Sequence, residues 1–203
     1  MSTHLLLTTC YLPPVSYFHC IQQNALPILI EKFDNFQKQT YRSRARIATA
    51  NGIQELIVPI QHSKRERSPM SEKRISYEFD WQRLHWLSLQ AAYRNSAYFE
   101  YYEDDFAQFY NKKFDFLFDF NIAQLELLLK SLKLKRELSF TEEYFRAVPD
   151  ALDFRDRVHP KKESLLISPK PYYQVFEDKN GFYSDLSIVD LLFSQGPQSK
   201  NYF

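Results

Sequence analysis

The first thirty residues hold two short apolar runs on either side of a segment with helical spacing. His4 to Thr9 is one run, and Pro27 to Glu31 is the other. Between them, behind a Pro13-Pro14 pair, the apolar residues of Val15 to Asn24 recur at the spacing of a helix face. A strand, a helix and a strand in this order predict a parallel crossover unit. The sequence therefore predicts an α/β fold built on a mostly parallel sheet.

A β-hairpin is predicted next. Tyr41 to Ala48 and Ile53 to Ile60 flank Asn51-Gly52, and Asn-Gly is the strongest short hairpin signal because both residues accept positive φ. The highly charged segment from Gln61 to Arg74 is predicted to be an exposed, mobile loop.

Helices dominate the middle of the chain. Three are predicted, over Asp80 to Asn95, Glu103 to Asn111 and Phe114 to Leu134. Asp80 is the expected N-cap of the first, and the third carries one long apolar stripe. Leu138 to Pro149 is expected to begin with a short strand and to continue as a turn of helix behind Thr141.

The last part of the chain is rich in prolines. It is predicted to hold a strand at Tyr172 to Phe176 and a closing helix at Leu186 to Phe193, behind Asp185 and stopped by Gly196-Pro197. We expect residues 1–203 to form a single domain with a helical C-terminal half. Within it, residues 1–79 are mainly α/β core, 80–148 mainly helical, and 149–203 loop-rich with a strand and the closing helix.

Composition excludes several function classes. Lys and Arg total 26 against 25 Asp and Glu, and a net charge of +1 provides no global field for nucleic acid. Three scattered glycines cannot form a Walker loop or a dinucleotide-binding turn. Two cysteines without a C-x-x-C pair, and histidines without ligand spacing, predict no metal site. The N-terminus lacks the features of a signal peptide or membrane span, so we expect a cytoplasmic protein. No particular cofactor is indicated.

The turn after the first strand is a candidate ligand site. Tyr11, Ser16 and Tyr17 surround Pro13 and Pro14 there. In parallel α/β folds ligands bind at the carboxyl ends of strands, and a helix N-terminus offers N–H groups to an anion. The alternative is that the prolines only stop the strand and the aromatic residues belong to the core.

The second candidate is a basic segment. Arg42, Arg44 and Arg46 would share one face of a strand, with Lys38 and Tyr41 close by in sequence. Guanidinium groups bind phosphate or carboxylate bidentately, so an anionic ligand is one interpretation. The other is a solvated face paired with Asp and Glu.

Three further clusters are weaker. His85 lies on one helix face with Trp81 and could transfer a proton, although a structural role is the more frequent one. The acidic run from Glu100 to Asp105 fits a helix start better than a magnesium site. A mixed-charge stretch suits either a polar pocket wall or surface salt bridges; it comprises Asp153, Arg155, Asp156, His159, Lys161, Lys162, Pro171 to Gln174 and Asp185.

In the order of these segments the chain resembles the WbqC-like family along nearly its whole length. The matching residues are Tyr11-Leu12-Pro13, Tyr17-Phe18, Lys38, Tyr41 to Arg44, Ile47, Asn51-Gly52, Leu56 to Pro59, Trp81, His85, Tyr93 and Tyr98-Phe99. The tail, Pro171 to Phe176 with Gly181-Phe182 and Leu186 to Phe193, looks like the Bacteroidetes version. Where many members have Gln-Pro in the first motif, this chain has Thr8-Thr9, and Pro14 and Ser16 replace a Trp and a Gly.

The resemblance implies a role in O-antigen or related surface-polysaccharide synthesis. It suggests an acyl or aminoacyl transferase, of a glycine-transferring type, acting on an activated sugar or a related small anionic molecule. His85 would then transfer the proton, and the ligand would be held by Tyr11, Tyr17, Lys38, Tyr41, Arg42, Arg44 and Trp81. The alternative is a non-catalytic protein that binds a small ligand or acts as a scaffold.

Overall fold

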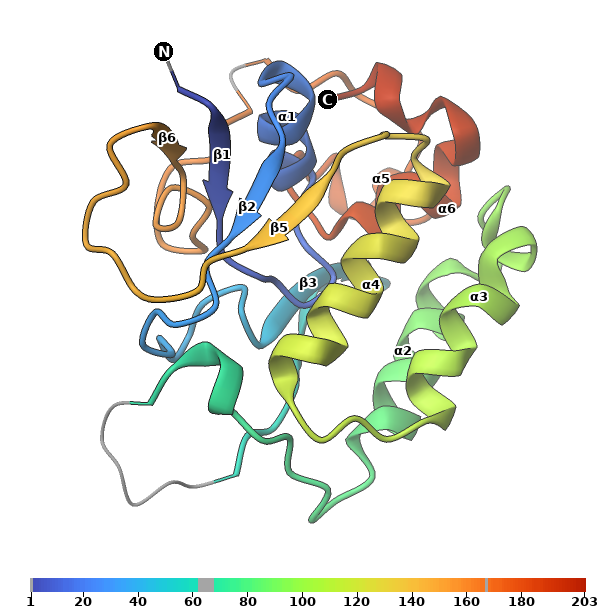
Figure 1. Ribbon diagram of the computed structural model, residues 1–203. Helices are drawn as coiled ribbons and strands as arrows, with labels where there is room; N and C mark the ends of the chain where they lie inside the picture. The colour runs from blue at the N-terminus through green and yellow to red at the C-terminus, as the bar shows by residue number, and fades with distance from the viewer. Residues whose placement is uncertain (1, 62–67, 167) are drawn as a thin grey trace.

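A four-stranded parallel sheet forms the centre of the computed structural model, which describes residues 2–61, 68–166 and 168–203. The strands are β1 (His4–Leu7), β2 (Ile28–Ile30), β5 (Leu138–Phe140) and β6 (Ala151–Asp153). Their order is β5-β2-β1-β6, and each neighbouring pair is parallel (Figure 1). The predicted α/β class is confirmed.

The crossover predicted at the N-terminus is present. The helix α1 (Val15–Gln23) connects β1 to β2, and the two strands pair in parallel from Leu5 opposite Ile28 to Leu7 opposite Ile30. The side chains of Leu5 and Leu7 are fully buried. Unbroken burial is typical of a parallel strand covered on both faces, which is why this segment lacks the alternation of a surface strand.

The predicted hairpin forms a separate sheet. β3 (Arg44–Thr49) pairs antiparallel with β4 (Gly52–Ile57), from Arg44 opposite Ile57 to Thr49 opposite Gly52. The turn therefore consists of Ala50 and Asn51. Gly52 has a φ of 101°, whereas Asn51 has no positive φ. Of the two residues that were expected to adopt positive φ, only the glycine does so.

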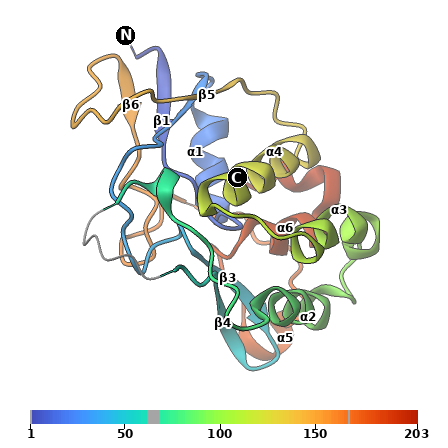
Figure 2. The same cartoon turned by 60° about the horizontal axis from the view of Figure 1, so that its bottom comes forward.

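Three helices lie together beside the sheet (Figures 1 and 2). They are α2 (Trp81–Tyr93), α3 (Phe99–Asn111) and α4 (Leu117–Ser131). All three were predicted, with differences at their ends. Asp80 is at the N-cap of α2 but its side chain makes no capping hydrogen bond. Because α3 begins at Phe99, the acidic run falls within its first turns.

The C-terminal part differs most from expectation. β6 was not predicted, residues 141–149 form no helix, and Tyr172 to Phe176 is not a strand. The elements there are α5 (Glu177–Asn180), α6 (Ile188–Gln195) and the 3₁₀ helix η2 (Gly196–Asn201). The N-cap of α6 is Ser187, whose hydroxyl accepts a hydrogen bond from the Val189 N–H, and not Asp185.

Part of the predicted charged loop, residues 62–67, lies outside the described residues. Its later part is not an exposed loop, because it forms the 3₁₀ helix η1 (Met70–Glu72), in which Met70 is fully buried. Among the described residues no helix has both the length and the apolar character needed to cross a membrane.

Candidate functional site

The strand order makes the carboxyl ends of β1 and β6 the place where a ligand would be expected. The chain leaves β1 through α1 to reach β2 on one side, whereas β6 pairs with β1 on the other. In open α/β sheets, ligands bind at the carboxyl ends of strands where connections diverge in this way. The start of α1 and the segment that follows β6 both lie at this point.

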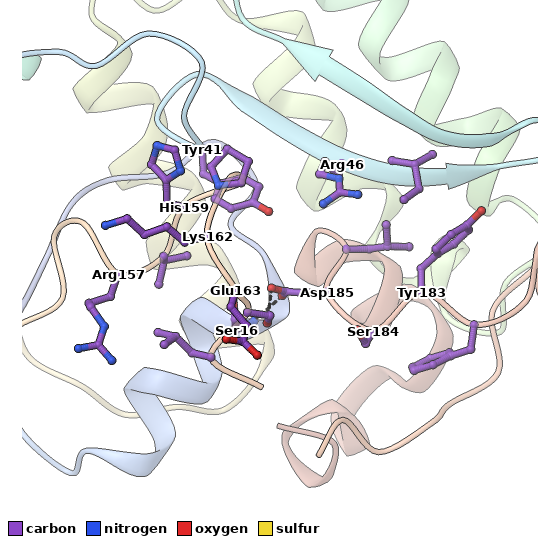
Figure 3. Close-up of a pocket in the computed structure, with 17 residues that line it drawn as sticks. Ser16, Tyr41, Arg46, Arg157, His159, Lys162, Glu163, Tyr183, Ser184 and Asp185 are labelled. Carbon is purple, nitrogen blue, oxygen red and sulfur yellow. Dashed lines mark hydrogen bonds between the residues drawn. The ribbon is translucent and has the colours of Figure 1, made fainter. Parts of the chain in front are cut away.

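A pocket of about 350 Å³ is found there. Figure 3 shows Arg46 entering from β3, with Arg157, His159 and Lys162 gathered on one side and Tyr183 on the other. The lining residues are Ser16, Tyr41, Arg46, Ile53, Arg157 to Pro160, Lys162 to Leu165 and Phe182 to Leu186.

Three cations of this pocket have no carboxylate partner. Arg46, Arg157 and Lys162 make no ion pair with any of the described residues. The Lys162 ammonium donates to the backbone carbonyl of Asp156 at 2.7 Å, and the Arg157 guanidinium lies 5.6 Å from the ring centre of Phe154. These groups therefore keep most of their hydrogen-bonding capacity for an anion.

His159 adds a neutral donor. Burial lowers its pKa, and the neighbouring Lys162 and Lys161 lower it further, so the imidazole is uncharged at pH 7. Its Nδ1 lies 3.0 Å from the backbone N–H of Lys161, which donates to it. A neutral imidazole that accepts at Nδ1 carries its proton on Nε2, so this nitrogen is a hydrogen-bond donor.

Asp185 occupies the start of α1. One of its carboxylate oxygens accepts from the Ser16 N–H at 2.9 Å, and the other accepts from the Ser164 hydroxyl at 2.6 Å (Figure 3 shows Asp185 beside Ser16). The anion position predicted at this helix N-terminus is thus filled by a side chain of the protein itself. Asp185 and Glu163 are the acidic residues of the pocket lining.

The segment from Leu186 to Ile188 forms backbone hydrogen bonds with both candidate sites of the sequence analysis, the turn after β1 and the arginine-containing strand β3. The Leu186 carbonyl accepts from the N–H of Val15 at 2.9 Å, and the Ile188 N–H donates to Pro13 at 2.8 Å. Between them, the Ser187 N–H donates to the Arg46 carbonyl at 2.8 Å. The turn after β1 and the arginine strand therefore lie on either side of this segment, next to the pocket.

Of the residues predicted to hold the ligand or transfer the proton, only Tyr41 lines the pocket, together with Ser16 and Arg46 from the two candidate segments. The Tyr41 side chain is 5% exposed. Burial raises its pKa, the Asp185 carboxylate raises it further, and the guanidinium of Arg46 lowers it. The phenol is therefore protonated at neutral pH and available as a hydrogen-bond donor.

The predicted row of three arginines is wrong. Arg42 precedes β3, in a turn, so the alternation of a strand does not apply to it. Its buried guanidinium pairs with Asp34 and donates to the Thr8 hydroxyl at 3.0 Å. Arg44 pairs with Glu55 across the hairpin at 2.9 Å, and Lys38 is exposed away from the pocket lining. The ligand-binding roles of these three residues remain predictions.

Tyr11 and His85 lie in the core. The Tyr11 hydroxyl is 2.9 Å from His85 Nδ1 and 3.0 Å from the Tyr110 hydroxyl, and Trp81 packs edge-on against His85. Burial lowers the His85 pKa to about 4. Tyr17 is buried too, and its hydroxyl donates to the Thr8 carbonyl at 3.0 Å. None of these residues lines the pocket, and the proton transfer assigned to His85 remains a prediction.

Several pocket residues were missed by the sequence analysis. His159, Lys162 and Asp185 belonged to the mixed-charge stretch considered as a pocket wall, but Arg157, Ser164 and Ser184 carried no signal of their own. In the described residues, no group of three His, Cys, Asp or Glu side chains is arranged to hold a metal ion. Cys10 and Cys20 are buried free thiols.

Comparison with known proteins identifies a family. The model of the WbqC-like protein family matches residues 9–159. An uncharacterised protein of Mycobacterium tuberculosis, Rv1507c, is 24% identical over 217 residues, which cover 95% of this chain and 93% of that protein. No solved structure matches the chain. The family match includes Ser16, Arg46 and Arg157, whereas Lys162 and Asp185 lie beyond it.

Proposed function

Because the chain belongs to the WbqC-like protein family, we propose that it binds a small anionic molecule in the pocket beside the start of α1 and the segment that follows β6, and transfers an acyl or aminoacyl group to it. The acceptor in this proposal is an activated sugar or a related phosphorylated compound. The observation that supports it most is the set of three cations, Arg46, Arg157 and Lys162, that line the pocket without a carboxylate partner among the described residues.

The polar groups of the pocket suit such a ligand. Guanidinium and ammonium groups bind phosphate oxygens strongly in a partly enclosed site. The carboxylate of Asp185 and the hydroxyl of Ser184 are suited to the hydroxyl groups of a sugar. His159 is the pocket residue best suited to proton transfer, because its lowered pKa keeps the imidazole neutral at pH 7.

Ligand screening tests the proposal. Thermal unfolding is measured with inorganic pyrophosphate, sugar phosphates and UDP-glucose, since a ligand that binds only the folded state raises the melting temperature. The Arg46→Gln and Arg157→Gln variants should each weaken the best ligand by about 10- to 100-fold, the loss expected for one charge-assisted hydrogen bond. Arg44→Gln is the matched control, because Arg44 lies on the same strand but pairs with Glu55 outside the pocket.

A transfer assay with the best ligand distinguishes a transferase from a non-catalytic ligand-binding protein. Incubating the bound ligand with acyl and aminoacyl donors, and following the product by mass spectrometry, should show transfer that His159→Ala abolishes. Binding without turnover would instead indicate a non-catalytic ligand-binding protein. Absence of binding by every anionic probe, or equal losses in Arg44→Gln and Arg46→Gln, would contradict the proposed site.

A further inference from the structure

Two buried polar side chains lie directly behind one wall of the pocket. The wall is the segment from Phe182 to Leu186, and the side chains are those of Gln174 and Asp190. Gln174 comes from the segment before α5 and Asp190 from the first turn of α6, and each is only 1% exposed. Neither lines the pocket, so their action on a ligand would be indirect.

The amide of Gln174 binds both backbone groups of Tyr183. Its Nε2 donates to the Tyr183 carbonyl at 2.9 Å, and its Oε1 accepts from the Tyr183 N–H at 2.9 Å. A residue in a neighbouring β-strand would provide the same pair of hydrogen bonds. Since Tyr183 lies in the middle of the wall, this clamp fixes the backbone from which the lining side chains extend.

Asp190 determines which way the Gln174 amide faces. One carboxylate oxygen, Oδ2, accepts from Gln174 Nε2 at 2.8 Å and from the Tyr172 hydroxyl at 2.7 Å. At pH 7 and above, which exceed the raised Asp190 pKa of about 6, the carboxylate is ionised and only accepts hydrogen bonds. It then requires the NH₂ end of the amide and leaves the amide oxygen for the Tyr183 N–H. The titratable groups around this carboxylate are Tyr172 and, from α2, Tyr93.

We propose that Gln174 and Asp190 are positioning residues for the pocket: Asp190 orients the Gln174 amide, and this amide holds the Tyr183 backbone and thereby the ligand-binding wall. The proposal rests on the proposed function of the pocket. It also explains why the strand predicted at Tyr172 to Phe176 does not form. Gln174 is the polar residue in a run that otherwise has the composition of a strand.

Amide hydrogen exchange of the full chain tests the clamp without any ligand. In Gln174→Glu at pH 8, the second carboxylate repels Asp190 and cannot donate to the Tyr183 carbonyl. Exchange protection of residues 181–186 should then fall at least tenfold relative to the wild type at the same pH. At pH 5, protonation of Asp190, whose pKa burial raises to about 6, or of the introduced Glu removes the repulsion between the two carboxyl groups, and protection should return to within about threefold.

The matched control is Gln82→Glu. Gln82 is also a buried glutamine, and its Nε2 donates to the carbonyls of Phe109 at 2.9 Å and Lys112 at 2.7 Å, away from the pocket. It should leave protection at 181–186 unchanged. If Gln174→Glu does not fold, Asp190→Asn is the second variant: it removes the charge that orients the amide, and protection at Tyr183 should fall at least threefold.

Calorimetry with inorganic pyrophosphate then connects the clamp to binding. In Gln174→Glu the Kd should rise at least fivefold at pH 8 and approach the wild-type value at pH 5. Unchanged exchange at pH 8, or lost protection with an unchanged Kd, would overturn the positioning role. Failure of the wild type to bind pyrophosphate or UDP-glucose would instead overturn the proposed function, and this result comes from a different measurement than the exchange.

Discussion

His85 and Asp190 are two buried titratable residues whose pKa values move in opposite directions. Burial lowers the pKa of His85 to about 4, and it raises the pKa of Asp190 to about 6. In both cases the protein favours the uncharged form. Between pH 4 and 6.5 the folded state binds less proton at His85 than the unfolded chain does, so this contribution to stability increases with pH. For Asp190 the folded state binds more proton between pH 4 and 6, so its contribution decreases with pH.

The first of these effects can be isolated with His85→Asn. At pH 7.5 the variant should be less stable than the wild type by about 1–2 kcal/mol, because it loses packing and the hydrogen bond with Tyr11. At pH 4 the wild type is also destabilised, because its folded state binds less proton at His85 than the unfolded chain does. The difference in the free energy of unfolding between the two proteins should therefore shift by about 3 kcal/mol in favour of the variant. Urea unfolding at both pH values measures this change. An equal difference at the two values would mean that His85 titrates normally in the folded protein.

At the scale of elements, α4 does more than its apolar stripe suggests. Asn121 and Gln124 are fully buried on this helix, and their amides bind the loop after β1. The Asn121 Nδ2 donates to the Thr9 hydroxyl of this loop at 3.3 Å and to the Arg42 carbonyl before β3 at 2.8 Å, and Gln124 Oε1 accepts from the N–H of Leu12 at 3.3 Å. Leu12 has a φ of 38°, in the left-handed region that a leucine rarely adopts. The helix therefore stabilises the unusual turn that follows β1.

The stripe itself gives a direct prediction. Leu125 is 2% exposed on α4, and Leu125→Asp would remove a buried apolar side chain and put an unpaired charge in its place. The protein should lose about 4 kcal/mol or more, enough to prevent folding in a protein of ordinary stability. Circular dichroism of the purified variant checks this, with Glu126→Asp at the exposed neighbouring position as the control. A folded Leu125→Asp protein without ligand binding would instead place α4 in the site.

Local signals account for the elements that were predicted. Helical spacing and the Asn-Gly pair act over a few residues, so α1, α2, α4 and the hairpin could be found from the sequence. β6 could not, because it has three residues and ends on Asp153, and it is a strand only through pairing with β1. Tyr172 to Phe176 has the composition of a strand, yet the Gln174 side chain bonds to Tyr183 in place of a backbone ladder.

At the scale of the whole molecule, the pocket brings together residues that lie far apart in the sequence, whereas most helices and the hairpin follow from local sequence patterns. Tyr41 and Arg46 could be proposed from one segment, but the pairing of Arg42 with Asp34 could not be read from strand alternation. Arg157 and Lys162 reach the pocket only because β6 brings its following loop beside β1. The pocket thus lies beside the turn after β1, and most of the side chains that line it differ from those predicted to hold a ligand.

The net charge of +1 means that any attraction for an anion must come from the pocket and not from the protein as a whole. At an ionic strength of 0.1 M, charges more than about 10 Å apart are largely screened, so Arg46, Arg157 and Lys162 should dominate. The affinity for pyrophosphate should fall about tenfold between 20 and 300 mM salt. Lys162→Gln should reduce this dependence, whereas Lys135→Gln changes the net charge equally but lies outside the pocket lining and should leave it unchanged. Calorimetry across the salt series measures both. Equal effects of the two variants would show that binding follows the total charge, and the three cations would then have no special role.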